Sequence, residues 1–200
     1  MVNWLYSEKV RKHFFNPVNV QLNTPEPHEF NATATIGSIV CGDMMQVWLR
    51  IDKVSEIIEK MTWKTFGCAT AIASTSVLSE MVAGKTLEQA REIKAEDIVK
   101  SLEGLPQNKI HCSVMGDKAL RMAINNYYRS TCQTEMIRQE TGKVIDTRLI
   151  VTDEEVKDLI RQGTDTLQGI QEHLKVGVGD KALIKEIEKI LEDERQGQKS

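Results

Sequence analysis

Residues 45–51, Met-Gln-Val-Trp-Leu-Arg-Ile, decide the fold class, because apolar and polar side chains alternate along them. The alternation puts Val47, Leu49 and Ile51 on one face, as in a half-buried β-strand. Residues 32–40 alternate in the same way, and residues 57–66 are rich in side chains that favour a pleated surface. The short connections leave no room for crossover helices, so the three runs predict an antiparallel meander.

The pattern changes to a helical period after the third run. Apolar residues recur at helical spacing in residues 71–82, and Gly84 ends that segment. Thr86 and Gln89 form a possible capping box, and residues 96–102 continue the helical character. Strands followed by helices predict an α+β domain, with a three-stranded antiparallel sheet and helices packed on it.

Two segments flank this core. Residues 6–15 have helical spacing and are ended by Asn16-Pro17, and residues 21–30 read as an extended loop. Periodicity breaks near residues 140–144, which predicts a first domain over 1–140, a small helical appendage over 143–194 and a polar tail over 195–200.

The appendage carries its own helix signals. Thr152 to Glu155 fits a capping box, Gly163 and Gly177 fit helix stops, and Asp180 fits the cap of a last helix.

Composition narrows the function classes. The chain has 200 residues, 40% hydrophobic content and a net charge of −3, which disfavour a nucleic-acid-binding role. Residues 1–20 contain no uninterrupted apolar run, and no stretch predicts a membrane span. We therefore expect a cytoplasmic protein, in whose reducing compartment cysteines bind metals or catalyse reactions more often than they form disulfides.

The most reactive side chains lie in the stretch Lys109-Ile110-His111-Cys112-Ser113. It places an imidazole beside a thiol at the start of a long helical pattern. The positive end of a helix dipole stabilises a thiolate. We therefore expect the pKa of Cys112 to be lowered.

Two further cysteines stand at predicted junctions between elements. Cys41-Gly42-Asp43 combines a thiol and a carboxylate, and Gly67-Cys68 precedes a helix. Spacing alone also allows buried, unliganded cysteines, and Asp43 could be an ordinary turn residue.

The remaining candidate ligands fit less well. Cys132 follows Cys112 by about 30 Å of helix and is expected to be a structural or surface residue. His13, His28 and His173 are expected to make ordinary hydrogen bonds.

These motifs together resemble the NifU/IscU family of iron–sulfur cluster assembly scaffolds. The match spans roughly residues 1–128 and keeps the family's order. The matching motifs are Tyr6 to Val10, His13 to Val20, Cys41 to Asp43, Lys64 to Cys68, Ala71 to Ser74, and Lys109 to Ser113.

The resemblance implies an IscU/SufE-like fold that has no enzymatic activity of its own. It makes Cys41, Cys68 and Cys112 cluster ligands, with Asp43 or His111 completing the site. The cluster would be [2Fe-2S], with [4Fe-4S] as the alternative, built from desulfurase-derived sulfur and released to acceptor proteins. A homodimer, at least a transient one, is also implied.

Two departures from the family pattern stand out. Leu105, Pro106 and Lys109 resemble a recognition loop for a dedicated ATP-driven chaperone, but Gln107 replaces the family's second proline. The appendage resembles the family's helical [2Fe-2S] domain, whose four ligand positions fall here on Asp146, Arg148, Asp180 and Leu183. None of these residues supplies a thiolate, so we expect a structural or docking role.

Two other functions use the same residues. Three thiolates with His111 or Asp43 also make a tetrahedral zinc site, so the alternative is a zinc-binding structural or regulatory protein. In a thiol enzyme, Cys112 would be the nucleophile and His111 its base.

Overall fold

A computed structural model describes residues 6–38, 43–106, 109–177 and 179–197. The chain divides into two compact units, residues 1–138 and 139–200. The first unit contains the predicted meander and the second contains the appendage.

The sheet of the first unit confirms the predicted antiparallel meander. Its strands run in the order β1-β2-β3, and both pairings are antiparallel. Their bounds are β1 Ala32–Ser38, β2 Asp43–Ile51 and β3 Ile58–Phe66. Strand β2 begins two residues earlier than predicted and pairs Asp43 with Ser38. Asp43 is therefore a strand residue whose backbone position is set by the sheet.

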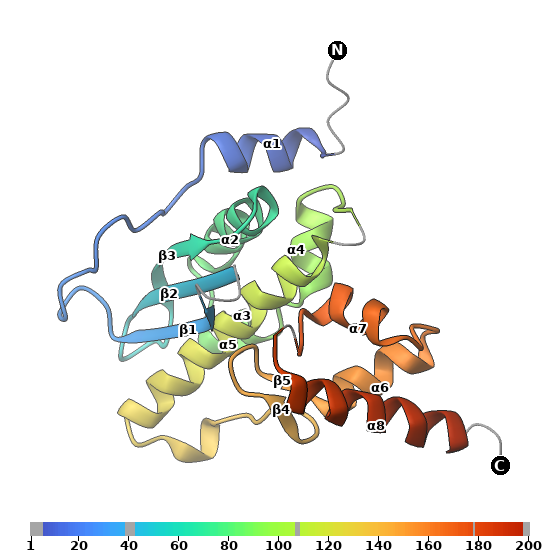
Figure 1. The fold of residues 1–200 in the computed structure, drawn as a ribbon. Coiled ribbons are helices and arrows are strands. Elements are labelled where there is room, and N and C mark those ends of the chain that lie inside the picture. The colour runs from blue at the N-terminus through green and yellow to red at the C-terminus, as the bar shows by residue number, and fades with distance from the viewer. Residues whose placement is uncertain (1–5, 39–42, 107–108, 178, 198–200) are drawn as a thin grey trace. The chain divides into compact units, whose positions relative to one another are not determined.

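Helices cover one face of this sheet, and α2 and α5 make most of the contacts with it (Figure 1). The helices of this unit are α1 Glu8–Phe15, α2 Ala69–Val82, α3 Leu87–Arg91, α4 Ala95–Ser101, α5 His111–Ser130 and the short 3-10 helix Thr134–Met136. The capping box of Thr86 and Gln89 is present at α3, as predicted. Apolar side chains from the sheet and helices form the core, among them Ile36, Val47, Leu49, Met61, Trp63, Leu78, Leu120 and Ile124. Burial of this much apolar surface is the main stabilising term.

Helix α2 is buried on nearly every side, because α1, β3, α4 and α5 all pack against it. Several of its small polar side chains find hydrogen-bond partners inside the core, although the buried Thr70 hydroxyl has none among the described residues. The Ser76 hydroxyl lies 2.9 Å from His13 Nδ1 and accepts a hydrogen bond from the Val18 backbone N–H. His13 thus makes ordinary hydrogen bonds, as predicted.

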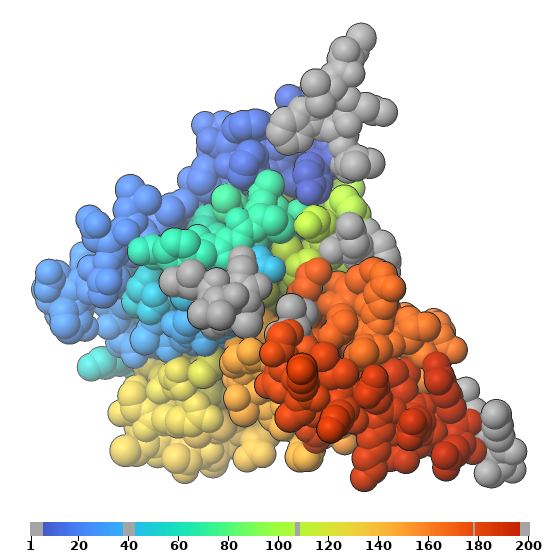
Figure 2. Space-filling view, in the orientation of Figure 1, coloured from blue at the N-terminus to red at the C-terminus, as the bar shows by residue number. Residues whose placement is uncertain are grey.

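The loop after α1 reaches the sheet and α5. Pro25 and Phe30 of this loop, Trp48 of β2 and Asn126 of α5 line one cavity of about 590 Å³. Trp48 is buried, although Val47 and Leu49 on either side of it point to the opposite face of the sheet. Figure 2 shows the N-terminal segment, in blue, at the surface of this unit. Phe15 and Leu22 are exposed on this segment.

The second unit is not purely helical, which corrects the sequence-based prediction. A two-stranded antiparallel sheet, β4 Val144–Asp146 and β5 Val151–Thr152, precedes the helices. Strands this short carry almost no alternation, so the sequence offered no period to detect. The helices are α6 Asp153–Arg161, α7 Leu167–Leu174 and α8 Lys181–Gly197.

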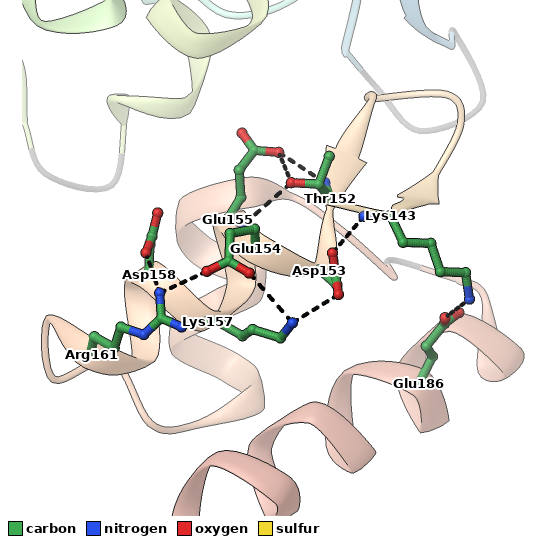
Figure 3. Close-up of polar contacts among 9 residues, drawn as sticks. All are labelled: Lys143, Thr152, Asp153, Glu154, Glu155, Lys157, Asp158, Arg161 and Glu186. Carbon is green, nitrogen blue, oxygen red and sulfur yellow. Dashed lines mark hydrogen bonds and ion pairs between the residues drawn. The ribbon is translucent and has the colours of Figure 1, made fainter. Parts of the chain in front are cut away.

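Helix ends in this unit follow the predictions with two exceptions. Thr152 and Glu155 form the expected capping box, and the Asp180 carboxylate accepts hydrogen bonds from the first turn of α8 (Figure 3 shows the α6 cap). Lys175, and not Gly177, is the left-handed residue that ends α7. Residues 195–197, expected in a polar tail, continue α8, because Arg195 donates to the Asp165 carbonyl and ties this turn down.

No helix within the described ranges is both long and apolar enough to cross a membrane.

Candidate functional site

Two cysteines that lie far apart in the sequence meet where α2 and α5 begin. Cys68 is the N-cap residue of α2, and Cys112 is the second residue of α5. Their sulfur atoms are 3.5 Å apart. Cys68 is half-buried and Cys112 is fully buried, so only Cys68 is open to solvent.

A histidine and a carboxylate lie beside the two thiols. His111 Nε2 is 3.4 Å from Cys112 Sγ and 3.9 Å from Asp43 Oδ2. The structure thus brings together four of the five predicted ligands, from β2, α2 and α5. The fifth, Cys41, lies outside the described residues.

Two glycines allow the Asp43 backbone and side chain to approach so closely. A Cβ atom on Gly67 would lie 2.9 Å from Asp43 Oδ1. A Cβ atom on Gly37, which has a φ of +78°, would lie only 2.2 Å from the Asp43 carbonyl oxygen. Any larger residue at either position would have to displace Asp43 or its neighbours.

The two thiols differ in their protonation, which corrects the prediction for Cys112. The hydrogen bond from Cys112 and the N–H groups at the start of α2 outweigh desolvation and lower the pKa of Cys68 to about 5. The same hydrogen bond, with burial and the nearby negative charges, raises the pKa of Cys112. The helix-start argument holds for Cys68, but Cys112 is the proton donor of the pair because it is buried beside a thiolate.

Lys109 lies within electrostatic reach of both thiols, because its charge lowers the pKa of Cys68 and of Cys112. It follows Leu105 and Pro106 in the predicted partner-binding loop, and its backbone N–H donates to the Pro106 carbonyl. All three residues are half-buried, and Gln107 lies outside the described residues. Lys109 therefore belongs to the thiol site as well as to the loop.

Sequence reasoning gave no role to Ser74 and Ser113, although both fall in the quoted motifs. Their hydroxyl oxygens are 3.2 Å apart and fully buried, and they join α2 to α5 one residue beyond Cys112. The only signal for this contact in the sequence was that Ser113 directly follows the candidate ligand Cys112. This contact helps to hold the two helix starts, and hence the two sulfurs, at a fixed separation.

The four side chains combine two soft thiols with a harder nitrogen and a harder oxygen. Such a set of ligands suits either zinc or iron that is bound together with sulfide. Within the described part of the chain, no three such side chains already converge as a finished metal site. The thiol-enzyme alternative fits poorly, because a nucleophile has to reach its substrate and Cys112 is fully buried.

The other predicted residues lie apart from this cluster. Cys132 is exposed beyond the end of α5, as expected. His173 Nδ1 lies 2.8 Å from the Gly169 carbonyl oxygen within α7 and makes an ordinary helix contact.

In the second unit, the four positions that the sequence analysis aligned with cluster ligands of the family line one pocket of about 390 Å³. They are Asp146, Arg148, Asp180 and Leu183. The buried Asp146 carboxylate accepts hydrogen bonds from the Arg148 guanidinium and from the backbone N–H groups of Arg148 and Leu149. The pocket wall therefore carries an ion pair whose carboxylate is also held by backbone N–H groups.

Known proteins resemble this chain in sequence. A family model described as NifU-like N terminal domain matches residues 5–134. The iron-sulfur cluster assembly scaffold protein IscU 1 of Archaeoglobus fulgidus is 38% identical over 135 residues, which cover 68% of this chain and 84% of that protein. The chain belongs to the NifU/IscU family.

Full-length NifU proteins of this family match both units. The nitrogen fixation protein NifU of Azotobacter chroococcum is 37% identical over 192 residues, which cover 96% of this chain and 60% of that protein. NifU of a Nostoc species is 35% identical over 197 residues, which cover 96% of this chain and 65% of that protein. The chain thus spans 60 to 65% of the length of the NifU proteins that it matches.

Proposed function

We propose that this NifU/IscU family chain is a scaffold on which a labile iron–sulfur cluster is assembled and then handed on. The names of its relatives, nitrogen fixation protein NifU and iron-sulfur cluster assembly scaffold protein IscU, support this function. They give no support to the zinc alternative. The observation that carries the proposal is the 3.5 Å approach of Cys68 and Cys112, with His111 and Asp43 beside them.

The cluster is the cargo of this site. Cys41, Cys68 and Cys112 supply thiolates, which iron binds firmly, and Asp43 or His111 supplies the fourth, weaker ligand. A storage or electron-transfer protein would gain from four thiolates, whereas a scaffold has to release its cargo. The proposed cargo is [2Fe-2S], and [4Fe-4S] is the alternative nuclearity.

The ionisation of the thiol pair supports stepwise loading. Cys68 is thiolate at neutral pH and half-exposed, so it is the first ligand that iron or a sulfur donor can reach. Cys112 must lose its proton when it binds iron, because only the thiolate is a ligand.

We assign partners to the same surface. A cysteine desulfurase would deliver sulfur to this site, where Cys41, Cys68 and Cys112 are the candidates to receive it, and acceptor proteins would take the cluster at the same opening. The loop of Leu105, Pro106 and Lys109 is the proposed contact for an ATP-driven chaperone, and a second copy of this chain is a further partner.

For the second unit we propose a structural or docking role without a cluster. The carboxylate–guanidinium pair of Asp146 and Arg148 occupies the pocket wall, and neither group suits an iron–sulfur cluster.

The test is anaerobic reconstitution of the full chain with iron, a thiol and a cysteine desulfurase, followed by visible spectra. We expect a chromophore in the parent and in Cys132→Ser, and its loss in Cys41→Ser, Cys68→Ser and Cys112→Ser. A parent without a chromophore that binds zinc tightly would overturn the proposal. A chromophore that survives the triple serine variant would place a cluster in the second unit and refute its assigned role.

A further inference from the structure

The cavity beside the loop after α1 is lined by groups that a ligand can use. Its volume of about 590 Å³ lies within the range of pockets that hold small ligands, about 300–1,000 Å³. Pro25, Phe30 and Trp48 give it apolar and aromatic walls, and α5 contributes Asn126 and Ser130. All of these residues belong to the first unit.

Trp48 brings an unused hydrogen-bond donor to this cavity. The residue is only 6% exposed, and no acceptor in the described part of the chain is bonded to its indole N–H. Trp63 differs, because its Nε1 atom donates to the Val18 carbonyl oxygen at 2.9 Å. Since a buried tryptophan usually finds a partner for this N–H, the missing acceptor at Trp48 is one that a ligand can supply.

Glu26 brings an unpaired carboxylate to the rim of the cavity. Its backbone N–H donates to Glu29 Oε2 at 2.9 Å, and its carbonyl oxygen accepts from the Glu29 N–H at 3.0 Å. The Glu29 carboxylate is thus used within the turn. The exposed Glu26 carboxylate, which lines the cavity, is paired with no group among the described residues.

The surroundings of Glu26 provide no cation for its carboxylate. Residues 13–49 contain no lysine or arginine, and none is among the described residues that line the cavity. Arg129 lies next to Ser130, but its Nη1 atom donates to Asn126 Oδ1 at 2.7 Å. The cavity therefore combines aromatic walls, a free N–H donor and an acidic rim.

We propose that this cavity binds an arginine side chain of a partner protein. A guanidinium group stacks on aromatic rings, and its planar fork of N–H groups matches a carboxylate. Trp48 and Phe30 provide the rings, and Glu26 provides the carboxylate. A backbone carbonyl oxygen beside the arginine accepts the Trp48 indole N–H, so the partner presents its arginine on an extended segment.

This binding goes beyond the proposed function and does not depend on it. Cys112 is the second residue of α5, and Asn126 lies about 20 Å further along the same helix. A partner held at the cavity leaves the opening beside Cys68 accessible.

The test uses the full chain, free of metal and labelled with ¹⁵N at tryptophan. The probe is the capped tripeptide acetyl-Gly-Arg-Gly-amide. The control peptide carries citrulline, which has the shape of arginine without its charge. NMR follows the indole N–H signals during each titration, and Trp48→Phe assigns the Trp48 signal.

We expect the arginine peptide to shift the Trp48 signal with a dissociation constant in the millimolar range. The Trp63 signal should stay in place, because its N–H is already bonded to Val18. The citrulline peptide should bind about tenfold more weakly, since it keeps the planar group and loses the charge.

Two substitutions in the same loop separate a contact with Glu26 from the general charge of the loop. Glu26→Gln should weaken binding of the arginine peptide about tenfold. Glu29→Gln removes the same charge but should weaken binding only slightly, because the Glu29 carboxylate serves the turn. Both side chains are exposed, and circular dichroism checks that both variants are folded.

The proposal is overturned if the arginine peptide leaves the Trp48 signal in place, or if the citrulline peptide binds equally well. Equal losses in Glu26→Gln and Glu29→Gln would also overturn it, because the rim would then act only through its overall charge. A lysine peptide that binds as tightly as the arginine peptide would refute the choice of a guanidinium group.

Discussion

The two units hold their clustered polar groups in opposite ways. In the first, Cys68 and Cys112 contact each other, and their shared proton sits on the buried sulfur. In the second, the Asp146 carboxylate is buried and accepts hydrogen bonds from the Arg148 guanidinium and from two backbone N–H groups.

The two arrangements therefore differ in what they can do chemically. Soft, polarisable sulfurs can exchange a proton for a metal or a second sulfur with little rearrangement. The buried Asp146 carboxylate stabilises one local conformation, because it accepts hydrogen bonds from two backbone N–H groups and from the exposed Arg148 guanidinium. Its removal leaves the backbone donors without their acceptor. The thiol site can therefore exchange its proton for a ligand, whereas the Asp146 site stabilises a turn.

The largest expected effect comes from removing the carboxylate of the second unit. Asp146→Ala leaves the Arg148 guanidinium and two backbone N–H groups without their acceptor, which costs about 2–3 kcal/mol of unfolding free energy. Hydrogen exchange of residues 144–191 and chemical denaturation of the full chain measure it.

The control for this prediction is Asp158→Ala, because the Asp158 side chain is exposed. Cluster assembly on the first unit should be unchanged in both variants. An Asp146→Ala protein with parental protection in the second unit would show that the ion pair does not hold this turn.

The next effect concerns the proton shared by the thiols. In the metal-free parent, alkylation of Cys68 should follow a midpoint near the pKa of about 5. Cys112→Ala removes the hydrogen-bond donor, so the pKa of Cys68 should rise and alkylation at pH 6 should slow by about tenfold or more. Peptide mass spectrometry after brief iodoacetamide treatment reads each cysteine separately.

Cys132→Ala is the matched control, since this exposed thiol lies far from the pair along α5. Equal midpoints for Cys68 in the parent and in Cys112→Ala would mean that the hydrogen bond does not cause the shift.

A smaller effect is expected on the lifetime of the cargo. Asp43→Ala removes a hard, exchangeable ligand, so the cluster should persist longer and transfer to an acceptor should slow several-fold. Gly67→Ala should act in the same direction, because its Cβ atom would displace the Asp43 carboxylate. Transfer kinetics followed by visible circular dichroism measure both.

Glu59→Ala serves as the control, because it changes an exposed carboxylate of the same sheet. If Asp43→Ala transferred its cluster at the parental rate, Asp43 would have no part in release.

The smallest effect is a pH dependence confined to the second unit. Hydrogen bonds from the Lys157 ammonium and the Arg161 guanidinium lower the pKa values of Asp153 and Glu154, respectively, at the start of α6 (Figure 3). A carboxyl group whose pKa is lower in the folded state stabilises that state at neutral pH, and this contribution is lost as pH falls through the lowered pKa. Acidification below about pH 4 should therefore weaken α6.

Hydrogen exchange at several pH values measures this loss of protection. The double variant Asp153→Asn and Glu154→Gln should flatten the dependence, because these side chains no longer titrate. An unchanged pH profile in that variant would assign the acid sensitivity to other groups.

Local patterns predicted much of this fold. The strands around Val47, the helix after Cys68 and the caps at Thr86 and Thr152 follow from periods and hydrogen bonds within a few residues. The strands β4 and β5 and the last turn of α8 were missed, because strands of two or three residues have no measurable period and that turn is held by Asp165, thirty residues away.

The family, the order of the motifs and the residue types of the candidate site can all be read from the sequence, because residue chemistry and short-range spacing are properties of the chain. The contact between Cys68 and Cys112, and the question of which thiol keeps the proton, depend on the folded structure. Contact between α2 and α5 depends on how the core packs, and the pKa of a thiol depends on the charges and burial that this packing creates. The burial of the Asp146 carboxylate is likewise a property of the packed unit, whereas its contact with Arg148, two residues away, is local.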